Sequence, residues 1–228
     1  MPGALLAGGA LAALLASTLA GTSAHAGGPV FEDPPDDSIV IKIATVNGSG
    51  CPQGTAAVAV SPDNKAFTVT YSDYLAQVGK GAKPVDFRKN CQLNLIMHVP
   101  QGFTYAIASV DYRGYAHLEQ GASSISKASY YFQGSPETTT HTHNYAGAYD
   151  DNWQATDKTD YAHLVWAPCG ELRNFNINTE LRVNAGTSDT KNTTSFMTMD
   201  STDGDVSTVY HFAWKKCDQP PKRPPQRR

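Results

Sequence analysis

The feature that most constrains this chain is a tight turn built around a cysteine. Residues Gly48–Thr55 read Gly-Ser-Gly-Cys-Pro-Gln-Gly-Thr, so Cys51 is surrounded by glycines, which tolerate positive φ, and a proline, which fixes its own φ. The segment lies between two runs of β-type residues. It therefore predicts a sharp, specified reversal of the chain near the start of the folded domain.

Three further cysteines limit how that turn can be tethered: Cys91, Cys169 and Cys217. Four cysteines in an exported chain favour two disulfides, and three pairings are possible. We prefer Cys51 with Cys91 and Cys169 with Cys217. Each bridge would close a loop of roughly forty-odd residues and stabilise the fold by about 4 kcal/mol on the chain-entropy model. The chain contains no Cys-x-x-Cys pair, which disfavours the alternative of a zinc site.

Residues 1–26 predict a secretory signal peptide. They contain no Asp, Glu, Lys or Arg, are apolar from Leu5 to Ala20, and end in Ala-His-Ala, a small-x-small sequence suited to signal peptidase. An uncleaved membrane anchor is the alternative, but glycine, serine and threonine interrupt the apolar run. We therefore expect cleavage and a secreted, extracellular protein without a transmembrane anchor, with association to a cell wall as a further option.

The rest of the chain divides by composition into three parts. Residues 27–37, rich in proline and acid, predict a leader without regular structure, and residues 38–217 predict a single β-domain. Residues 218–228 combine prolines with Lys and Arg and predict a disordered basic tail, which favours solubility over adhesion to an anionic wall. The formal net charge of −3 is too small to indicate a nucleic-acid partner.

Short runs of alternating apolar and polar residues predict a chain made of strands, and no long window shows an apolar stripe of helical period. Ser61–Lys65 predicts a hairpin turn, and Thr138–Tyr145 predicts a strand at the surface. We also expect one helical turn within Ser72–Gly79, a polar loop over Asp150–Asp160 and a strand over Tyr161–Ala167.

The resulting fold class is all-β. Roughly ten short strands separated by turns predict an antiparallel β-sandwich, jelly-roll-like, held by two disulfides, in preference to a barrel. No internal repeat is detectable, which argues against a propeller or a β-solenoid.

An ordered set of motifs resembles a known family. The turn at Gly48–Thr55 is followed by Phe-Thr-Val-Thr-Tyr-Ser-Asp-Tyr at 67–74, by Asn-Cys-Gln-Leu at 90–93 and by Cys-Gly at 169–170. This pattern is similar to the secreted family known as domain of unknown function 4360, seen in fungi and actinobacteria, and would cover about Ser38 to Cys217. The resemblance supports the pairing of Cys51 with Cys91 and implies no activity.

The sequence contains no recognisable catalytic constellation. Nucleophilic catalysis needs a Ser or Cys beside a base and an oriented third group, and no Gly-x-Ser-x-Gly motif occurs. Glycoside hydrolysis needs paired carboxylates, whereas Glu119, Glu137, Glu171 and Glu180 are scattered singly. We therefore favour a protein that is not an enzyme and that has no cofactor.

Two weak metal candidates stand out. His141 and His143 are two residues apart on an expected strand, which places both imidazoles on one face, but a third ligand is missing locally. Asp200, Asp203 and Asp205 bring three carboxylates together, without the distal Glu of an EF-hand. Solvated polar positions and an acidic hairpin turn are the favoured interpretations, so we predict no metal site.

A glycan-binding surface is the more suggestive possibility. Eleven Tyr and three Trp in an exported β-protein could supply aromatic planes for the apolar faces of sugar rings. Trp153, with Tyr149, Asp151 and Asn152 beside it, is the best candidate because it lies in a segment expected to be a polar surface loop. The alternative is that Trp153 is part of the core.

These observations predict a secreted, non-catalytic β-sandwich that binds polysaccharide or another cell-surface ligand. A secreted hydrolase acting on polysaccharide is one alternative. A secreted effector or inhibitor that binds another protein is a second.

Overall fold

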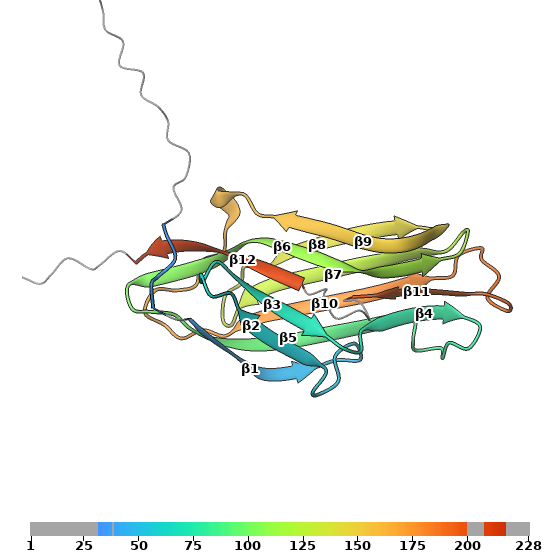
Figure 1. The fold of residues 1–228 in the computed structure, drawn as a ribbon, viewed down its shortest axis with the longest axis horizontal. Helices are drawn as coiled ribbons and strands as arrows, with labels where there is room; N and C mark the ends of the chain where they lie inside the picture. Colours follow the sequence, from blue (N-terminus) through green and yellow to red (C-terminus); the bar gives the residue numbers. More distant parts are fainter. Residues whose placement is uncertain (1–31, 38, 200–207, 218–228) are drawn as a thin grey trace, which may run out of the picture. The chain divides into compact units, whose positions relative to one another are not determined.

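Two antiparallel sheets pack face to face in the computed structural model, which describes residues 32–37, 39–199 and 208–217 (Figure 1). These residues belong to one compact unit. The β-sandwich predicted from the sequence is confirmed, with twelve strands in the described part where roughly ten were expected. In chain order the elements are β1 (Val40–Asn47), β2 (Ala56–Val60), β3 (Ala66–Tyr71), β4 (Leu75–Gly79), β5 (Arg88–His98), β6 (Phe103–Leu118), β7 (Ser123–Phe132), β8 (Thr139–Ala146), β9 (Tyr149–Lys158), the 3₁₀ turn η1 (Tyr161–His163), β10 (Phe175–Asn184), β11 (Thr194–Thr198) and β12 (Thr208–Lys216).

The sheets differ in how their strands are ordered. The five-stranded sheet has the order β1-β5-β10-β7-β8. In the seven-stranded sheet, β2, β3 and β12 lead to β6, and β11 and β4 continue the order beyond it, while β9 pairs with β6 alone. The strands β8 and β9 are therefore edge strands of different sheets, joined by a short turn and lying close together in Figure 1.

The long strand β6 organises the seven-stranded sheet. Its first half pairs with β12, from Phe103 opposite Lys216 to Asp111 opposite Val209. Its second half pairs with β11, and β9 pairs with residues 109–118. One strand of sixteen residues thus fixes the register of three others, including the segment expected to form a loop around Trp153.

The alternation within the strands explains the packing between the sheets. Inward-facing side chains of both sheets are buried, and aromatic rings fill much of this interior. Phe67 and Tyr210 stack with ring centroids 4.7 Å apart, and Tyr130 meets Tyr210 edge-on at 5.9 Å. Burying a large apolar side chain contributes about 1.5–3 kcal/mol, so this aromatic cluster is a major source of stability.

Both predicted disulfides are confirmed. Cys51 is joined to Cys91 and Cys169 to Cys217, with Cα atoms 5.3 and 5.8 Å apart. The turn before β2 is accordingly fixed to β5. At Gly48 the φ angle is +141°, and a Cβ atom there would lie 2.1 Å from the carbonyl oxygen of Asn90. Glycine is therefore required at this position by both conformation and close approach.

The hairpin over Ser61–Lys65 and the exposed strand β8 are confirmed, but two local predictions are wrong. Residues of Ser72–Gly79 form strand β4 rather than a helical turn, because β4 pairs along its whole length with β11. Tyr161–Ala167 contains the 3₁₀ turn η1 and no strand. That segment turns away after β9 and returns to β6 where Ala167 N donates to Tyr105 O at 2.9 Å.

The described part of the leader has no regular structure, as predicted, but it is attached to the sandwich. The side-chain amide of Asn64 donates to the carbonyl oxygens of Pro35 and Asp37 at 2.9 and 3.0 Å, and Glu32 N donates to Trp214 O. The signal peptide, the basic tail and the acidic segment with Asp200, Asp203 and Asp205 lie outside the described residues. Among the described residues, no helix is long and apolar enough to cross a membrane.

Candidate functional site

Trp153 is a core residue rather than an exposed platform. Its side chain is 1% exposed, its indole N–H donates to the Thr198 carbonyl at 2.9 Å, and its ring lies 5.5 Å from that of Tyr145. The segment around it is strand β9, not a loop. Trp153 and Asp157 face inward on this strand while the polar residues between them face outward, so the composition resembled that of a surface loop. The predicted stacking role of Trp153 is therefore wrong.

The other three predicted ligand-binding residues do not form a site around Trp153. Tyr149 donates its hydroxyl to the carbonyl of Asn152 at 2.9 Å, and its ring lies 6.2 Å from that of Tyr145. Asp151 is exposed. Asn152 is also exposed and lies opposite Tyr115 of β6, on the outward face of the seven-stranded sheet.

That outward face carries a group of aromatic and polar side chains, of which only Asn152 is among the predicted ligand-binding residues. On β6, Tyr115 and His117 alternate with buried residues, and on β11 Phe196 lies opposite His117. On β9, Asp150 lies opposite His117. We call Tyr115, His117, Phe196, Asp150 and Asn152 the outer strip.

Hydrogen bonds hold the side chains of the outer strip in place. The Tyr115 hydroxyl donates to Asp150 Oδ1, and His117 Nδ1 lies 3.0 Å from the same oxygen. On its other side, His117 Nε2 lies 3.3 Å from Glu119 Oε1. The hydrogen bond to Asp150 raises the pKa of both Tyr115 and His117, and the hydrogen bonds from Tyr115 and then His117 lower the pKa of Asp150.

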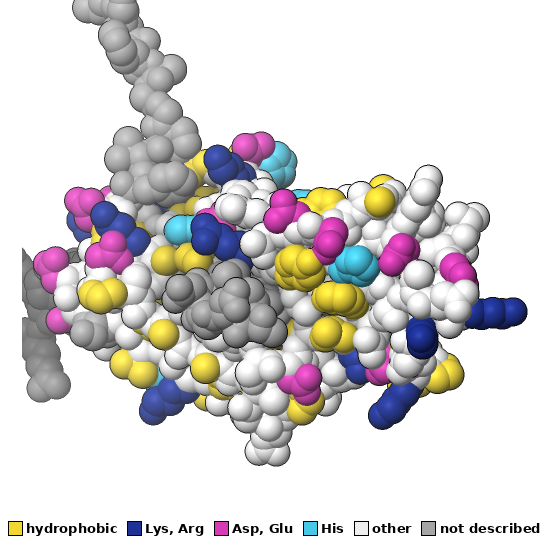
Figure 2. Space-filling model, turned by 45° about the vertical axis from the view of Figure 1, so that its right-hand side comes forward, with side chains coloured by type: hydrophobic (Ala, Val, Ile, Leu, Met, Phe, Trp, Pro, Cys, Tyr) yellow, Lys and Arg dark blue, Asp and Glu magenta, His cyan; other side chains and the backbone are white. Residues whose placement is uncertain are grey.

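The rings of the outer strip lie next to one another. The imidazole of His117 stacks on Phe196 with centroids 5.7 Å apart, and Tyr115 is 5.9 Å from the same phenyl ring. All three are half-buried, so each keeps part of its surface open to solvent. On the face drawn in Figure 2, hydrophobic, acidic and histidine side chains gather side by side. Such an arrangement offers apolar planes and hydrogen-bond acceptors to a ligand at the same place.

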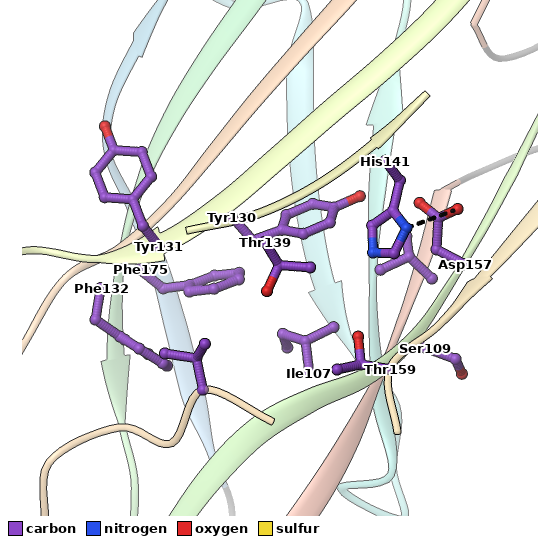
Figure 3. Close-up of a pocket in the computed structure, with 12 residues that line it drawn as sticks. Ile107, Ser109, Tyr130, Tyr131, Phe132, Thr139, His141, Asp157, Thr159 and Phe175 are labelled. Carbon is purple, nitrogen blue, oxygen red and sulfur yellow. Dashed lines mark ion pairs between the residues drawn. The ribbon is translucent and has the colours of Figure 1, made fainter. Parts of the chain in front are cut away.

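The two predicted metal candidates on β8 point towards the interior. His141 Nδ1 lies 3.6 Å from Asp157 Oδ1 (Figure 3). His143 Nε2 lies 2.7 Å from the same oxygen. The prediction that both imidazoles share one face is thus confirmed. Among the described residues, however, no group of three or more His, Cys, Asp or Glu side chains is placed to hold a metal ion. Asp157, fourteen residues after His143, is the partner that sequence spacing could not identify.

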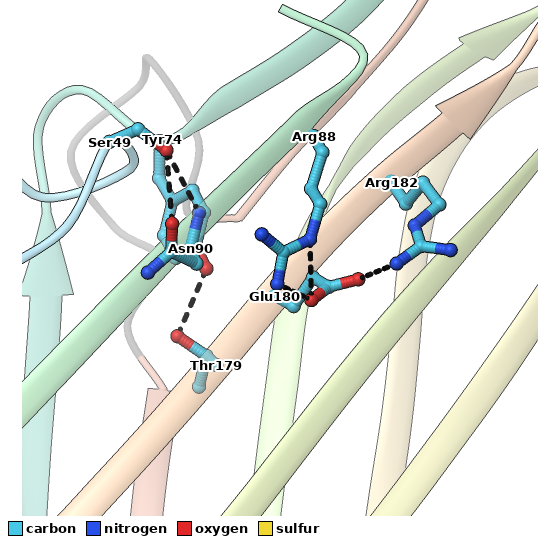
Figure 4. Close-up of polar contacts among 7 residues, drawn as sticks. All are labelled: Ser49, Tyr74, Arg88, Asn90, Thr179, Glu180 and Arg182. Atoms are coloured by element: carbon cyan, nitrogen blue, oxygen red, sulfur yellow. Dashed lines mark hydrogen bonds and ion pairs between the residues drawn. The ribbon is translucent and has the colours of Figure 1, made fainter. Parts of the chain in front are cut away.

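The scattered carboxylates are largely occupied by neighbours. On the five-stranded sheet, Glu180 accepts hydrogen bonds from Arg88 and from Arg182, the latter at 2.7 Å (Figure 4). Nearby, the buried Tyr74 hydroxyl lies 3.1 Å from Thr179 Oγ1 (Figure 4). These contacts fix side chains on the sheet. Both carboxylate oxygens of Glu180 accept hydrogen bonds from arginine, which is typical of a structural carboxylate.

A solved structure, a secreted fungal protein and a family model are similar to this chain. The solved structure of TmCBM61 in complex with β-1,4-galactotriose is 11% identical, with 77% of this chain and 90% of that chain covered and a TM-score of 0.29. A protein of Arthroderma benhamiae described as an uncharacterized secreted protein is 36% identical over 184 residues, which are 81% of this chain and 74% of that protein. Residues 37–217 match the family described as domain of unknown function (DUF4360), and the chain therefore belongs to the DUF4360 family.

Proposed function

We propose that this protein is a secreted, non-catalytic β-sandwich that binds polysaccharide on the outer strip. Secretion is supported by the signal sequence over residues 1–26, by the two disulfides and by the description of the Arthroderma benhamiae relative as secreted. The observation that carries the binding role is the contact of Tyr115, His117 and Phe196 beside a hydrogen-bonded carboxylate.

The chemistry of the outer strip suits a carbohydrate. A sugar ring presents apolar C–H groups, which pack on aromatic planes, and hydroxyl groups, which donate to carboxylate and amide oxygens. Phe196 and Tyr115 offer the planes, and Asp150 and Asn152 offer the oxygens. Because the strip lies on paired strands and is fixed by its own hydrogen bonds, little side-chain freedom would be lost on binding.

The test is retention of purified protein on a panel of insoluble polysaccharides, with release of soluble sugar measured in the same tubes. Tyr115→Ala and Phe196→Ala should each weaken retention about threefold to tenfold, as expected for loss of one aromatic contact. Tyr161→Ala is the matched control, because Tyr161 is a 37% exposed aromatic in η1, which follows the end of β9 paired with Ser109, whereas the strip lies at the other end of β9. Circular dichroism and the thermal midpoint establish that each variant is folded.

Three outcomes would contradict the proposal. Wild-type protein that is retained on none of the polysaccharides would favour a protein ligand. Equal retention of the wild type and both strip variants would indicate that the protein binds polysaccharide through another surface. Release of soluble sugar by the wild type would favour a hydrolase.

A further inference from the structure

A small cavity lies between the edge strands β8 and β9, on the opposite side of β9 from the outer strip. Side chains of β6, β7, β8, β9 and β10 line it together with residues after β9, and its volume is about 20 Å³ (Figure 3). A cavity needs roughly 10–15 Å³ by this measure to hold a water molecule. The space therefore suits a single small polar group.

The cavity contains a buried carboxylate with an oxygen left over. Asp157 is 5% exposed, and its Oδ1 atom contacts both His141 and His143 of β8. Its Oδ2 atom is buried and has no hydrogen-bond partner within the described part of the chain. Burying a carboxylate oxygen without a hydrogen bond costs several times more free energy than burying an unpaired neutral oxygen. A hydrogen-bond donor is therefore expected at this position.

A second buried oxygen faces the same space. The hydroxyl of Tyr130 on β7 is also without a partner among the described residues, and Figure 3 shows it directed towards the side of the cavity where Asp157 lies. Burial, and then the charge of Asp157, raise the pKa of Tyr130. The phenol therefore stays neutral and can accept a hydrogen bond from a ligand.

The remaining walls are aromatic and hydroxylic. Tyr130 and Phe175 stack with centroids 6.4 Å apart, and the side chains of Ser109, Thr139 and Thr159 complete the lining. A negative charge, several neutral acceptors and aromatic faces within one small space are the features that recognise an ammonium group. A water molecule could also donate to these oxygens, whereas an ammonium group would add a positive charge at Oδ2, the oxygen that the two histidines at Oδ1 do not contact.

We propose that this cavity binds a primary ammonium group, held by Asp157 Oδ2 and the Tyr130 hydroxyl. The group could belong to a free small amine or to an amino sugar with an unblocked amino group, since both present the same three donors. The cavity has room for the head group alone, so the rest of a larger ligand would have to lie outside it. This inference does not depend on the outer strip.

The experiment measures binding of methylammonium chloride to the full mature protein at pH 8 by nuclear magnetic resonance, with sodium chloride at equal ionic strength as reference. The wild type should show saturable shifts that sodium does not cause. Asp157→Asn should weaken binding about tenfold or more, because a charge-assisted hydrogen bond is lost. Asp111→Asn is the matched control: Asp111 on β6 pairs with His211 of β12 at 2.8 Å, but its other oxygen accepts a hydrogen bond from Thr156 of β9.

Two further measurements keep the proposal open to refutation. Tyr130→Phe removes only the hydroxyl, and it should weaken methylammonium binding without lowering the thermal midpoint. Binding of glucosamine would show that an amino sugar is accepted as well as a free amine, and N-acetylglucosamine, which lacks the ammonium group, is its control. Absence of saturable methylammonium binding, which would indicate bound water only, would overturn the proposal, as would undiminished binding by Asp157→Asn or, if that variant does not fold, by Tyr130→Phe.

Discussion

Replacing Trp153 by alanine should destabilise the protein strongly. The indole is 1% exposed and its N–H donates to Thr198 O at 2.9 Å. Truncation of a buried tryptophan costs about 3–5 kcal/mol, partly through the cavity that it leaves, and the carbonyl at Thr198 would lose its partner as well. For a domain of this size, that loss corresponds to a thermal midpoint roughly 6–20 °C lower.

Thermal and urea unfolding of the protein with both disulfides intact measures this effect. Trp153→Phe keeps an aromatic ring but loses the N–H donor, so its cost should be smaller than that of Trp153→Ala. Trp166→Ala is the control, because Trp166 is only half-buried and carries Lys215 over its ring at 4.9 Å. A loss below about 1 kcal/mol for Trp153→Ala, together with lost retention on polysaccharide, would refute the assignment of Trp153 to the core.

Three further substitutions test the fold and the outer strip. Gly114→Ala should cost at least about 1–3 kcal/mol in unfolding, because its Cβ atom would lie 2.1 Å from a backbone carbonyl at the end of β11; a neutral result would show that β11 shifts freely. Replacing both Cys51 and Cys91 by alanine should lower the free energy of unfolding by about 4 kcal/mol, and an unchanged urea midpoint would contradict this. Asp150→Asn should lower the pKa of His117, followed by nuclear magnetic resonance, because the hydrogen bond to Asp150 raises it. The stability contributed by that pair is fully present below the ordinary imidazole pKa of about 6.5 and is lost as pH rises through the raised value, so a midpoint that rises with pH in this range would contradict the pairing.

Most of the fold could be predicted because strands and turns are determined by residues that are close together in the sequence. Alternation of apolar and polar residues identifies a strand with one buried face, and the glycine-bracketed turn at Gly48–Thr55 marks a reversal that few other sequences could form. The same reasoning placed His141 and His143 on one face of β8, where they are found. The position of Asp157 opposite them could not be read from spacing, because it depends on two edge strands from different sheets meeting.

The sequence predicted Asn152 of the outer strip, but its aromatic residues could not be grouped with it for the same reason. Tyr115 and His117 alternate with buried residues, which indicates an outward face, but their contact with Phe196 depends on the pairing of β6 with β11 across many intervening residues. For Trp153 the error came from composition. A strand whose outward face is wholly polar, and whose inward face includes an aspartate, has the same residue content as a surface loop.

The central position of β6 sets an order in which the chain can acquire its structure. Its two partners on one side, β11 and β12, are the last strands of the sequence, whereas β9 on the other side follows soon after it. During vectorial synthesis or export, one long hydrogen-bonding edge therefore stays open until the C-terminal strands arrive, and contacts of such separation form slowly. Cys51 and Cys91 can join early, but the bridge between Cys169 and Cys217 has to wait for the final strand.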